Sequence, residues 1–260
     1  MIFSFKKNIE KICIVIRSLN FKIPLSSDSG IRILTYHSIG GSPKDHRQAV
    51  RVPVEEFKRQ MEFLADYVYK TYTVSELIGN RISQNPEHSI ILTFDDGYKD
   101  NITVVAPLLK KLGFSATFFI NVSYADGAVK KKWRNGMPRE YMNWDDVLRL
   151  SEMGFEIGSH MVHHTNLTVL NDNELNFEFT NSRDTISKNI NKPIEVFSCP
   201  YGKINQRVIQ VAKDTGYIAG CSSFRGVNNL YTDKYILRRT EIDGFDTISD
   251  FKHKLGGFYD

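Results

Sequence analysis

The sequence predicts a single α/β domain in which short strands alternate with helices, and in which the parallel sheet closes into a (β/α) barrel, complete or distorted. Two observations lead to this prediction. The chain has 260 residues, of which 41% are hydrophobic and 25% charged, a composition typical of a globular protein with a large buried core. From Gly30 onward it also contains about seven strand-and-helix units, which suits a barrel better than an open sheet.

Seven short runs have the composition of buried strands, because each is rich in Ile, Val, Phe or Tyr and is bounded by Gly, Pro, Asn or Asp. Between them lie helical patterns with apolar residues three or four apart, several of which are followed directly by glycine, as is expected at helix ends. The predicted strands are residues 31–36, 90–94, 116–120, 155–158, 194–198, 217–221 and 235–238. The predicted helices are residues 55–69, 102–112, 144–153, 172–189 and 206–215.

Charge and cysteine content exclude several classes of protein. The net charge is +4 and the basic residues are scattered, whereas nucleic-acid-binding proteins concentrate them on one stripe, so no nucleic-acid partner is expected. Three cysteines without close spacing argue against a disulfide framework and against a four-cysteine zinc site. No stretch approaches the roughly 18 consecutive apolar residues that a membrane-spanning helix needs.

Residues 1–29 are predicted to form a separate amphipathic segment ahead of the main domain at residues 30–260. Apolar side chains recur there at helical spacing among several basic residues, which suits either a helix on a membrane surface or a helix packed on the domain itself. The apolar stretch at 12–16 is interrupted by Arg17 and is too short for the core of a signal peptide. We therefore expect a cytoplasmic protein, with peripheral membrane association if the first alternative holds.

Two adjacent carboxylates, Asp95 and Asp96, follow an apolar run that ends at Phe94. Burying a charge is costly unless it is paired, so these residues are not there for packing. In a parallel barrel the carboxyl ends of the strands form the active site, and Gly97 allows a turn that brings both carboxylates to it. The alternative is that the two aspartates cap the following helix.

Three histidines, His160, His163 and His164, follow another predicted strand. Histidines four residues apart can bind one ion if the segment is helical or tightly turned, and Asp96 from a neighbouring strand end would supply a third ligand. Two histidines and one carboxylate with an open position are typical of a catalytic metal site rather than a structural one. His163 lies between the two proposed ligands and could replace His164.

Hydrolysis at such a site also needs a base and a donor to the oxyanion. Met161 stands where a zincin helix has its glutamate, so the base must come from elsewhere, and Asp95 is the free carboxylate. Pro200, Tyr201 and Gly202 follow a further predicted strand. The proline fixes the backbone, so the Tyr201 N–H could point rigidly into the site as an oxyanion donor does, although this tripeptide alone indicates only a turn.

These three motifs, at 93–97, 160–164 and 200–202, resemble in order and spacing those of the polysaccharide deacetylase family, which has the NodB-homology fold. The resemblance extends over nearly the whole chain outside the N-terminus. It implies a distorted (β/α) barrel that removes N-acetyl, and sometimes O-acetyl, groups from sugar polymers with the help of a divalent metal, usually zinc. The residue roles that it implies are Asp95 as general base, Asp96, His160 and His164 as metal ligands, and the Tyr201 N–H, placed by Pro200, as oxyanion donor.

The chain departs from this family in its third motif, where Ser198 stands in the position of a common arginine. The resemblance therefore leaves Asp95 without the arginine that would orient it. Arg238 and Arg239, in the fifth motif, are the two candidates to replace it.

The fifth motif also lacks the family's usual general-acid histidine. The segment 34–39 resembles the branch that deacetylates poly-β-1,6-N-acetylglucosamine and other surface polysaccharides, in which a Tyr-His pair on the first strand supplies the acid. Of the other histidines, His46 and His88 lie in polar stretches and His253 in a C-terminal helical pattern. We therefore expect His37 to be the general acid, although a histidine at a strand end can equally be structural.

The only long irregular insertion spans residues 124–141. A loop of this length forms either the rim of a binding site or a solvated excursion. It carries Tyr124, Trp133 and Tyr141, and aromatic faces stack on sugar rings, so we expect Trp133 to contact the substrate.

The function expected from these residues is metal-dependent hydrolysis of N-acetyl groups on a sugar polymer or glycan precursor, with Asp95 accepting a proton from the attacking water. One alternative is a deacetylase of a small or lipid-linked sugar, or another C–N hydrolase with the same fold. A second is a non-catalytic glycan-binding domain, which the presence of a base beside a metal site argues against.

Overall fold

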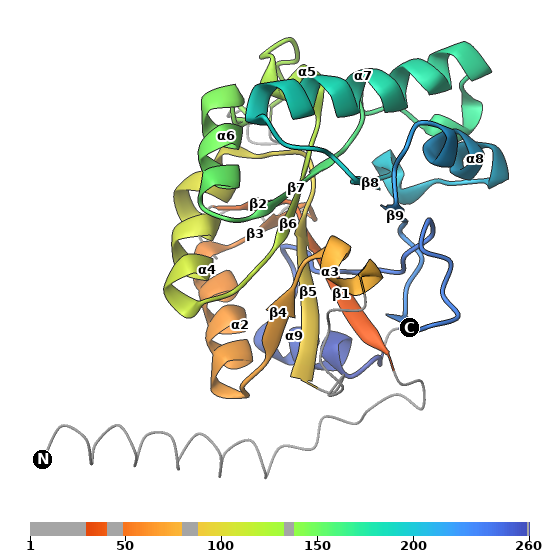
Figure 1. Cartoon of the computed structure of the whole chain (residues 1–260). Helices are drawn as coiled ribbons and strands as arrows, with labels where there is room; N and C mark the ends of the chain where they lie inside the picture. Colours follow the sequence, from red (N-terminus) through yellow and green to blue (C-terminus); the bar gives the residue numbers. More distant parts are fainter. Residues whose placement is uncertain (1–29, 41–48, 80–87, 133–137, 259) are drawn as a thin grey trace, which may run out of the picture.

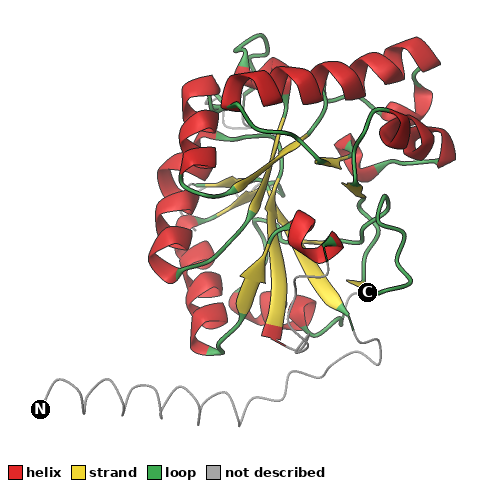
Figure 2. Cartoon of the chain, viewed as in Figure 1, coloured by secondary structure: helices red, strands yellow, loops and turns green. Residues whose placement is uncertain are grey.

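The strands of the protein form a strongly curled, mainly parallel sheet (Figures 1 and 2). This computed structural model describes residues 30–40, 49–79, 88–132, 138–258 and 260. The parallel strands, in their spatial order, are β1 (Ile31–Tyr36), β5 (Ser89–Phe94), β6 (Thr117–Ile120), β7 (Glu156–Ser159), β8 (Val196–Ser198) and β9 (Ala219–Cys221). The α/β fold class is confirmed, and the sheet has the form of a distorted half-barrel rather than a regular closed one.

Short strands make the sheet irregular at its two ends. β10 (Val227–Asn228) pairs antiparallel with β1, whereas β11 (Thr240–Glu241) pairs parallel with it. Leu237 forms a parallel bridge to β9, so the segment 237–241 connects the last strand of the sheet to the first. Of the strand predicted at 235–238, only this bridge at Leu237 is present, and the regular strand β11 begins two residues after the predicted one ends.

Two further features were not predicted from the sequence. β4 (Lys70–Tyr72) pairs with the first half of β5, whereas β6 pairs with its second half. β2 (Ser38–Ile39) and β3 (Arg51–Val52) form a separate two-stranded sheet. All three are too short to give a periodic sequence pattern of their own.

Helices cover the outer face of the curled sheet (Figures 1 and 2). Each of the five predicted helices is present, and α3 and α5 are additional short ones. The helices are α2 (Val54–Asp66), α3 (Val74–Ile78), α4 (Ala106–Leu112), α5 (Val122–Ala125), α6 (Trp144–Glu152), α7 (Asp172–Ile190), α8 (Gln206–Asp214) and α9 (Ile248–Leu255). A π-helical turn, η2 (Asn101–Val105), precedes α4, and two 3₁₀ turns are η3 (Leu167–Val169) and η4 (Pro200–Gly202).

Local sequence explains where these helices begin and end. α3, α6, α7 and α9 each start with a capping box, in which an Asn or Thr side chain and an acidic side chain three residues later satisfy each other's backbone N–H groups. Each cap of this kind is worth about 1 kcal/mol. α4 ends at Gly113, whose φ of 72° is the left-handed conformation that glycine adopts without strain.

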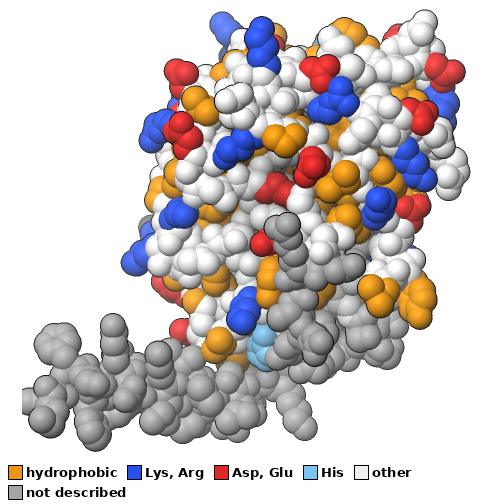
Figure 3. Space-filling view, in the orientation of Figure 1, with side chains coloured by type: hydrophobic (Ala, Val, Ile, Leu, Met, Phe, Trp, Pro, Cys, Tyr) orange, Lys and Arg blue, Asp and Glu red, His pale blue; other side chains and the backbone are white. Residues whose placement is uncertain are grey.

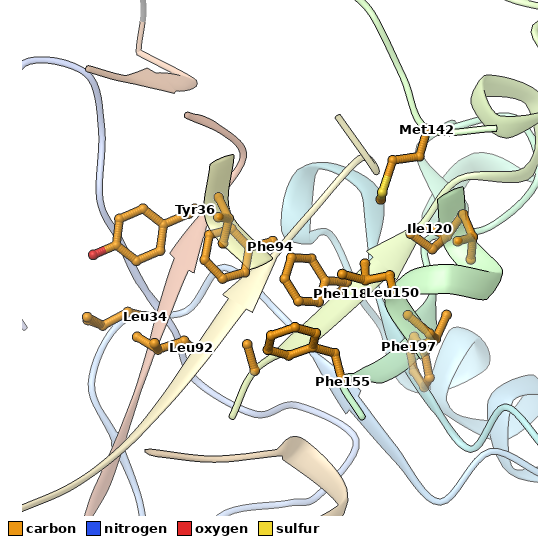
Figure 4. Close-up of a cluster of buried hydrophobic side chains, with 14 of the residues drawn as sticks. Leu34, Tyr36, Leu92, Phe94, Phe118, Ile120, Met142, Leu150, Phe155 and Phe197 are labelled. Carbon is orange, nitrogen blue, oxygen red and sulfur yellow. The ribbon is translucent and has the colours of Figure 1, made fainter. Parts of the chain in front are cut away.

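Side chains along each strand alternate between two separate cores. On the outer face, Tyr36, Phe94 and Phe118 are neighbours in register on β1, β5 and β6, and their rings stack with centroids 5.3 and 4.8 Å apart (Figure 4). The helix α2 packs on this row through Phe57, whose ring meets Tyr36 and Phe94 edge-on. The outer row therefore locks the register of the three strands whose ends lead into the site.

The inner face of the sheet carries a smaller buried cluster. Its members are Ile31, Ile33, Val74, Ile91, Phe119, Val196, Ala219, Cys221 and Leu237. Gly158 of β7 leaves room for the Phe119 ring, since a Cβ at this position would lie 2.5 Å from it. This cluster closes the inside of the half-barrel below the site.

The surface bears out the scattered charge of the sequence. On the face shown in Figure 3, basic and acidic side chains are interspersed and form no basic stripe. Cys199 and Cys221 are buried free thiols. No helix within the described ranges is long and apolar enough to cross a bilayer. The predicted amphipathic segment at 1–29 lies outside the described residues, so its contact with a membrane stays a prediction.

Candidate active site

The carboxyl ends of β1, β5, β7 and β8 open into one pocket of about 450 Å³. This is the edge of the sheet at which a parallel barrel is expected to carry its active site. The predicted site residues that line this pocket are His37, Asp95, Asp96, His160, His164, Tyr201 and Arg239.

The two-residue period of the strands places the catalytic side chains in this pocket. Tyr36 and Phe94 are register partners that point into the outer core, so the residues that follow them, His37 and Asp95, point to the inner side. The Asp95 N–H donates to the Tyr36 carbonyl oxygen over 2.9 Å, which extends the ladder just past the strand end. These two side chains from different strands therefore meet at the pocket floor.

A metal-ligand triad occupies one side of the pocket. The Asp96 Oδ1 atom lies 3.0 Å from His164 Nε2 and 3.4 Å from His160 Nε2, and the three side chains offer ligand atoms within 4.8 Å of one another. Asp96 Oδ1 is buried and accepts no hydrogen bond from any residue that the structure describes. Because a carboxylate oxygen and two imidazole nitrogens converge on one point, this donor set fits a divalent cation.

Backbone strain in the connecting turns directs the ligands inward. Asp96 and His164 have φ angles of 74° and 50°, and Met161 and Tyr201 have 61° and 60°. Non-glycine residues rarely adopt this left-handed region, and such strain persists where the surrounding structure holds it. Gly97, with φ of 73°, then completes the turn after Asp96 without that cost.

His160 is held in one orientation by its second ring nitrogen. His160 Nδ1 lies 2.8 Å from the Ser198 carbonyl oxygen, which can only accept a hydrogen bond. This contact assigns the proton to Nδ1 and leaves the Nε2 lone pair directed toward Asp96. The Asn121 side-chain amide donates to the carbonyl oxygens of His160 and Met161, which fixes the backbone of the same turn.

The structure separates His163 from the two ligand histidines. Its Nδ1 atom lies 2.5 Å from Glu178 Oε1 of α7, and its side chain is 59% exposed. The other Glu178 oxygen accepts the N–H groups of Val162 and His163, so this buried carboxylate holds the whole turn. Of the two alternatives left by the sequence, His164 lies in the triad and His163 lies outside it.

Asp95 forms a buried ion pair at the floor of the pocket. Both carboxylate oxygens accept from Arg239, over 2.9 and 2.8 Å, and Ser198 Oγ donates to the second oxygen over 3.0 Å. Burial alone would raise the pKa of Asp95, but Arg239 and the neighbouring His160 and His37 lower it to about 2. Asp95 is therefore a carboxylate at any pH near neutrality, as a base must be.

The two candidate arginines have different positions. Arg239 Nη2 donates to Ser198 Oγ as well as to Asp95, and its Nε donates to the Ser222 carbonyl oxygen. Arg238 instead lies outside the ion pair and donates to the Arg225 carbonyl oxygen. The expectation that left both arginines as candidates is thus corrected to Arg239 alone, and Ser198 together with Arg239 occupies the place of the family's arginine.

Tyr201, on the turn that begins at Pro200, and His37 are two further predicted residues that line the pocket. Pro200 is buried and begins the tight turn η4, whereas the Tyr201 side chain is exposed and its ring meets the His164 ring edge-on at 4.9 Å. His37 Nδ1 is buried, and it lies 3.9 Å from Glu241 Oε1. His37 is close enough to both Asp95 and Asp96 to lower the pKa of each, so it lies within the reaction site.

Asp100 and Asn101 hold the backbone on which His37 stands. The Asp100 carboxylate accepts from Ser38 Oγ over 2.6 Å and from the Ile39 N–H over 3.0 Å, and the Asn101 amide donates to the His37 carbonyl oxygen over 2.9 Å. Burial raises the pKa of Asp100 to about 6, although these hydrogen bonds oppose the rise.

This pKa makes the stability of the fold depend on pH. An unfolded aspartate titrates near pH 3.9, so between about pH 4 and pH 6 the folded state binds more protons and its stability falls as pH rises. In Asp100→Asn this slope is absent. We expect the unfolding free energy of the wild type, relative to the variant, to fall by on the order of 2 kcal/mol from pH 4 to pH 7. Denaturant unfolding at these two pH values measures it, and a relative stability that stays flat or rises would contradict the shift.

The structure adds an aromatic wall that the sequence analysis did not assemble. The rings of Tyr98, Tyr141 and Tyr124 stack in that order with centroids 5.0 and 4.3 Å apart, and Tyr124 stacks on His164 at 5.7 Å. Tyr98 directly follows Gly97, so its position next to the first motif was a usable signal. Trp133, the predicted sugar-stacking residue, lies outside the described residues and stays a prediction.

The sequence model of the polysaccharide deacetylase family matches residues 83–220, which include Asp95 and the whole ligand triad. The chain belongs to this family. The family inferred from the three motifs is thereby confirmed, and with it the class of reaction: polysaccharide deacetylases are hydrolases that act on non-peptide carbon–nitrogen bonds.

Individual relatives agree with this assignment. YxkH of Bacillus subtilis, a polysaccharide deacetylase by name, is 28% identical over 212 residues, which are 81% of this chain and 70% of YxkH. The Streptococcus pyogenes deacetylase PplD, solved in complex with acetate, superposes with a TM-score of 0.76 at 21% identity, over 87% of this chain and 98% of PplD. A de-N-acetylase from Aggregatibacter actinomycetemcomitans gives 0.70 at 24%, over 85% of this chain and 99% of that one. The two structures establish the shared fold.

Proposed function

We propose that this polysaccharide deacetylase hydrolyses the N-acetyl group of an N-acetylated sugar within a glycan polymer or a glycan precursor. The observation that carries the proposal is that the ion-paired base Asp95 lines the same pocket as the triad of Asp96, His160 and His164. A binding module has no use for an ionised base beside a metal site, whereas amide hydrolysis needs both.

The chemistry divides among the residues of the pocket. A divalent ion on the triad, when bound, would polarise the acetyl carbonyl and acidify a water molecule. Asp95 accepts the proton of the attacking water. Arg239 holds the Asp95 side chain in one rotamer, so that the carboxylate stays oriented for this proton transfer. The Tyr201 N–H, on the rigid turn after Pro200, is our candidate donor to the developing oxyanion.

The departing sugar amine needs a proton, because an amine anion is too poor a leaving group in water. His37 is the candidate donor, since it lines the same pocket as the triad and the fifth motif supplies only arginines, which hold their protons too tightly.

Acetate release tests the proposal. The metal-loaded protein is incubated with N-acetylglucosamine, its β-1,4- and β-1,6-linked oligomers, and a lipid-linked N-acetylated sugar, and the deacetylated products are identified by mass spectrometry. We expect a mass loss of one acetyl group from at least one polymeric or lipid-linked substrate, and none after chelation. Tight binding of a glycan without any acetate release would instead identify a glycan-binding module.

Replacement of His37 tests the assignment of the acid. His37→Ala is expected to lower kcat by about 10²-fold or more with the metal content unchanged, because protonation of the amine is lost while the triad is intact. The alkaline limb of the pH–rate profile should be erased at the same time. His253→Ala, on α9 away from the pocket, is the matched control and should keep the wild-type profile. An unaltered profile in His37→Ala would assign the acid to another group.

A further inference from the structure

The pocket carries more positive charge than the reaction described above uses. Four cationic side chains line it, and of these Arg239 is occupied by Asp95. The other three are Lys131, Arg139 and Arg225. Glu241 is the one rim carboxylate among the described lining residues, and it faces His37. Among the described residues of the rim, cationic side chains therefore outnumber anionic ones.

Lys131 and Arg139 come from two facing stretches of the insertion. The Arg139 N–H donates to the Lys131 carbonyl oxygen over 2.8 Å, and Lys132 forms an antiparallel bridge with Pro138, so the two cationic residues are cross-strand neighbours. Like charges placed in this way repel each other. Their juxtaposition is explained if a third, anionic group joins them.

Both side chains are fixed on the aromatic wall. Arg139 Nη1 donates to the Tyr98 hydroxyl over 3.1 Å. Lys131 Nζ bonds the Tyr124 hydroxyl and lies over the Tyr124 ring, 4.7 Å from its centroid. Since the Tyr124 ring stacks directly on His164, Lys131 lies one ring away from the ligand triad, whereas Arg139 bonds Tyr98 at the other end of the same stack.

The electrostatics of Lys131 agree with this position. Burial lowers the pKa of Lys131, Asp96 partly offsets that effect, and Arg139 lowers the pKa further. Asp96 is a triad ligand, and within the described residues Lys131 has no carboxylate at ion-pair distance. A partly desolvated ammonium group next to a guanidinium group favours an oxyanion from outside the protein.

We propose that Lys131 and Arg139 form an oxyanion subsite beside the ligand triad, and that the substrate carries a phosphate or carboxylate group on the acetylated sugar or on its direct neighbour. This inference rests on the proposed function and narrows it, because an uncharged N-acetylglucosamine polymer has no group for the subsite. Arg225, which lines the same pocket, adds to the field that attracts such a substrate.

Weak binding measured by ligand-observed NMR tests the subsite without turnover. The metal-loaded protein is titrated with N-acetylglucosamine, N-acetylglucosamine 1-phosphate and N-acetylmuramic acid at low ionic strength. We expect at least one of the two anionic sugars to bind about tenfold or more tightly than the neutral one, with a preference that shrinks as salt is added. The two anionic probes distinguish phosphate from carboxylate, and a wild type without preference for either overturns the proposal.

Variants separate the subsite from other causes of the same preference. In the double variant Lys131→Gln/Arg139→Gln the preference for anionic sugars should vanish at unchanged metal content. With Lys131 intact, Arg139→Lys should keep more of this preference than Arg139→Gln does. Lys132→Gln, an exposed neighbour outside the pocket, is the matched control for loss of one charge and should keep the preference. If the preference survives in the double variant, the anionic group binds the metal rather than Lys131 and Arg139. If it is lost equally in Lys132→Gln, the preference comes from the net charge of the protein. Either result overturns the subsite.

Acetate release from the same three sugars and their oligomers keeps the two proposals apart. A binding preference that depends on Lys131 and Arg139, with no acetate released from any substrate, supports the subsite and refutes the deacetylation. Acetate released equally from neutral and anionic substrates, by the wild type and the double variant alike, supports the deacetylation and refutes the subsite.

Discussion

Asp95→Asn is expected to reduce turnover by at least about 10²-fold while a divalent ion stays bound. The substitution keeps the shape of the side chain but removes its ability to accept a proton. Asp95 contacts Arg239 and Ser198 rather than the triad, so the ligand atoms of Asp96, His160 and His164 keep their positions. Metal content after dialysis, measured with the rate of acetate release, tests both halves of this expectation.

The same substitution leaves Arg239 buried without its counter-ion, which costs about 3–5 kcal/mol when one member of a buried pair is removed. Thermal unfolding must therefore show that the variant is folded at the assay temperature. Ser198→Ala is the matched control, since it removes one hydrogen bond to Asp95 but leaves the charge, and it should lower the rate by less than about tenfold. Loss of the ion from Asp95→Asn on dialysis would show that Asp95 is a ligand.

The alternation of side chains explains how much of this site the sequence could predict. Strands predicted to end at Phe94, Gly158 and Ser198 place Asp95, His160 and the turn at Pro200 at one edge of a parallel sheet, and the structure brings them there. The same alternation also distinguishes the two arginines. Leu237 belongs to the inner core, so Arg239, two residues later, faces inward and Arg238 faces outward.

Other parts of the site depend on contacts between segments far apart in the chain. The choice of His164 over His163 is made by Glu178 of α7, a residue whose helical position gives no sign that it binds the turn. The left-handed conformations of Asp96 and His164 likewise could not be predicted, because non-glycine residues rarely adopt this region and do so where the surrounding structure holds them. The basic pair of Lys131 and Arg139 becomes visible only once the insertion folds back on the aromatic wall.

The second large effect is expected at the ligand triad, where the chain offers two histidines in adjacent positions. His164→Ala should weaken metal binding by more than about 10²-fold and remove turnover, since a direct ligand is lost. Loss of a residue that only hydrogen-bonds a ligand already lowers metal affinity by about 10–100-fold. His163→Ala should retain both the ion and the activity, because its ring is bonded to Glu178 and exposed to solvent.

The two variants also differ in their effect on stability, which makes the comparison informative in the absence of an activity assay. His163→Ala removes the hydrogen bond to Glu178 Oε1, while Oε2 still accepts the N–H groups of Val162 and His163, so the expected loss is about 1.5–3 kcal/mol. His164→Ala should lower the melting temperature of the metal-loaded protein but not that of the chelated one, because a ligand that binds the folded state stabilises it only where it binds. If instead His163→Ala loses the ion and His164→Ala keeps it, the triad is wrongly assigned, and the turn held by Glu178 must open in the metal-bound protein.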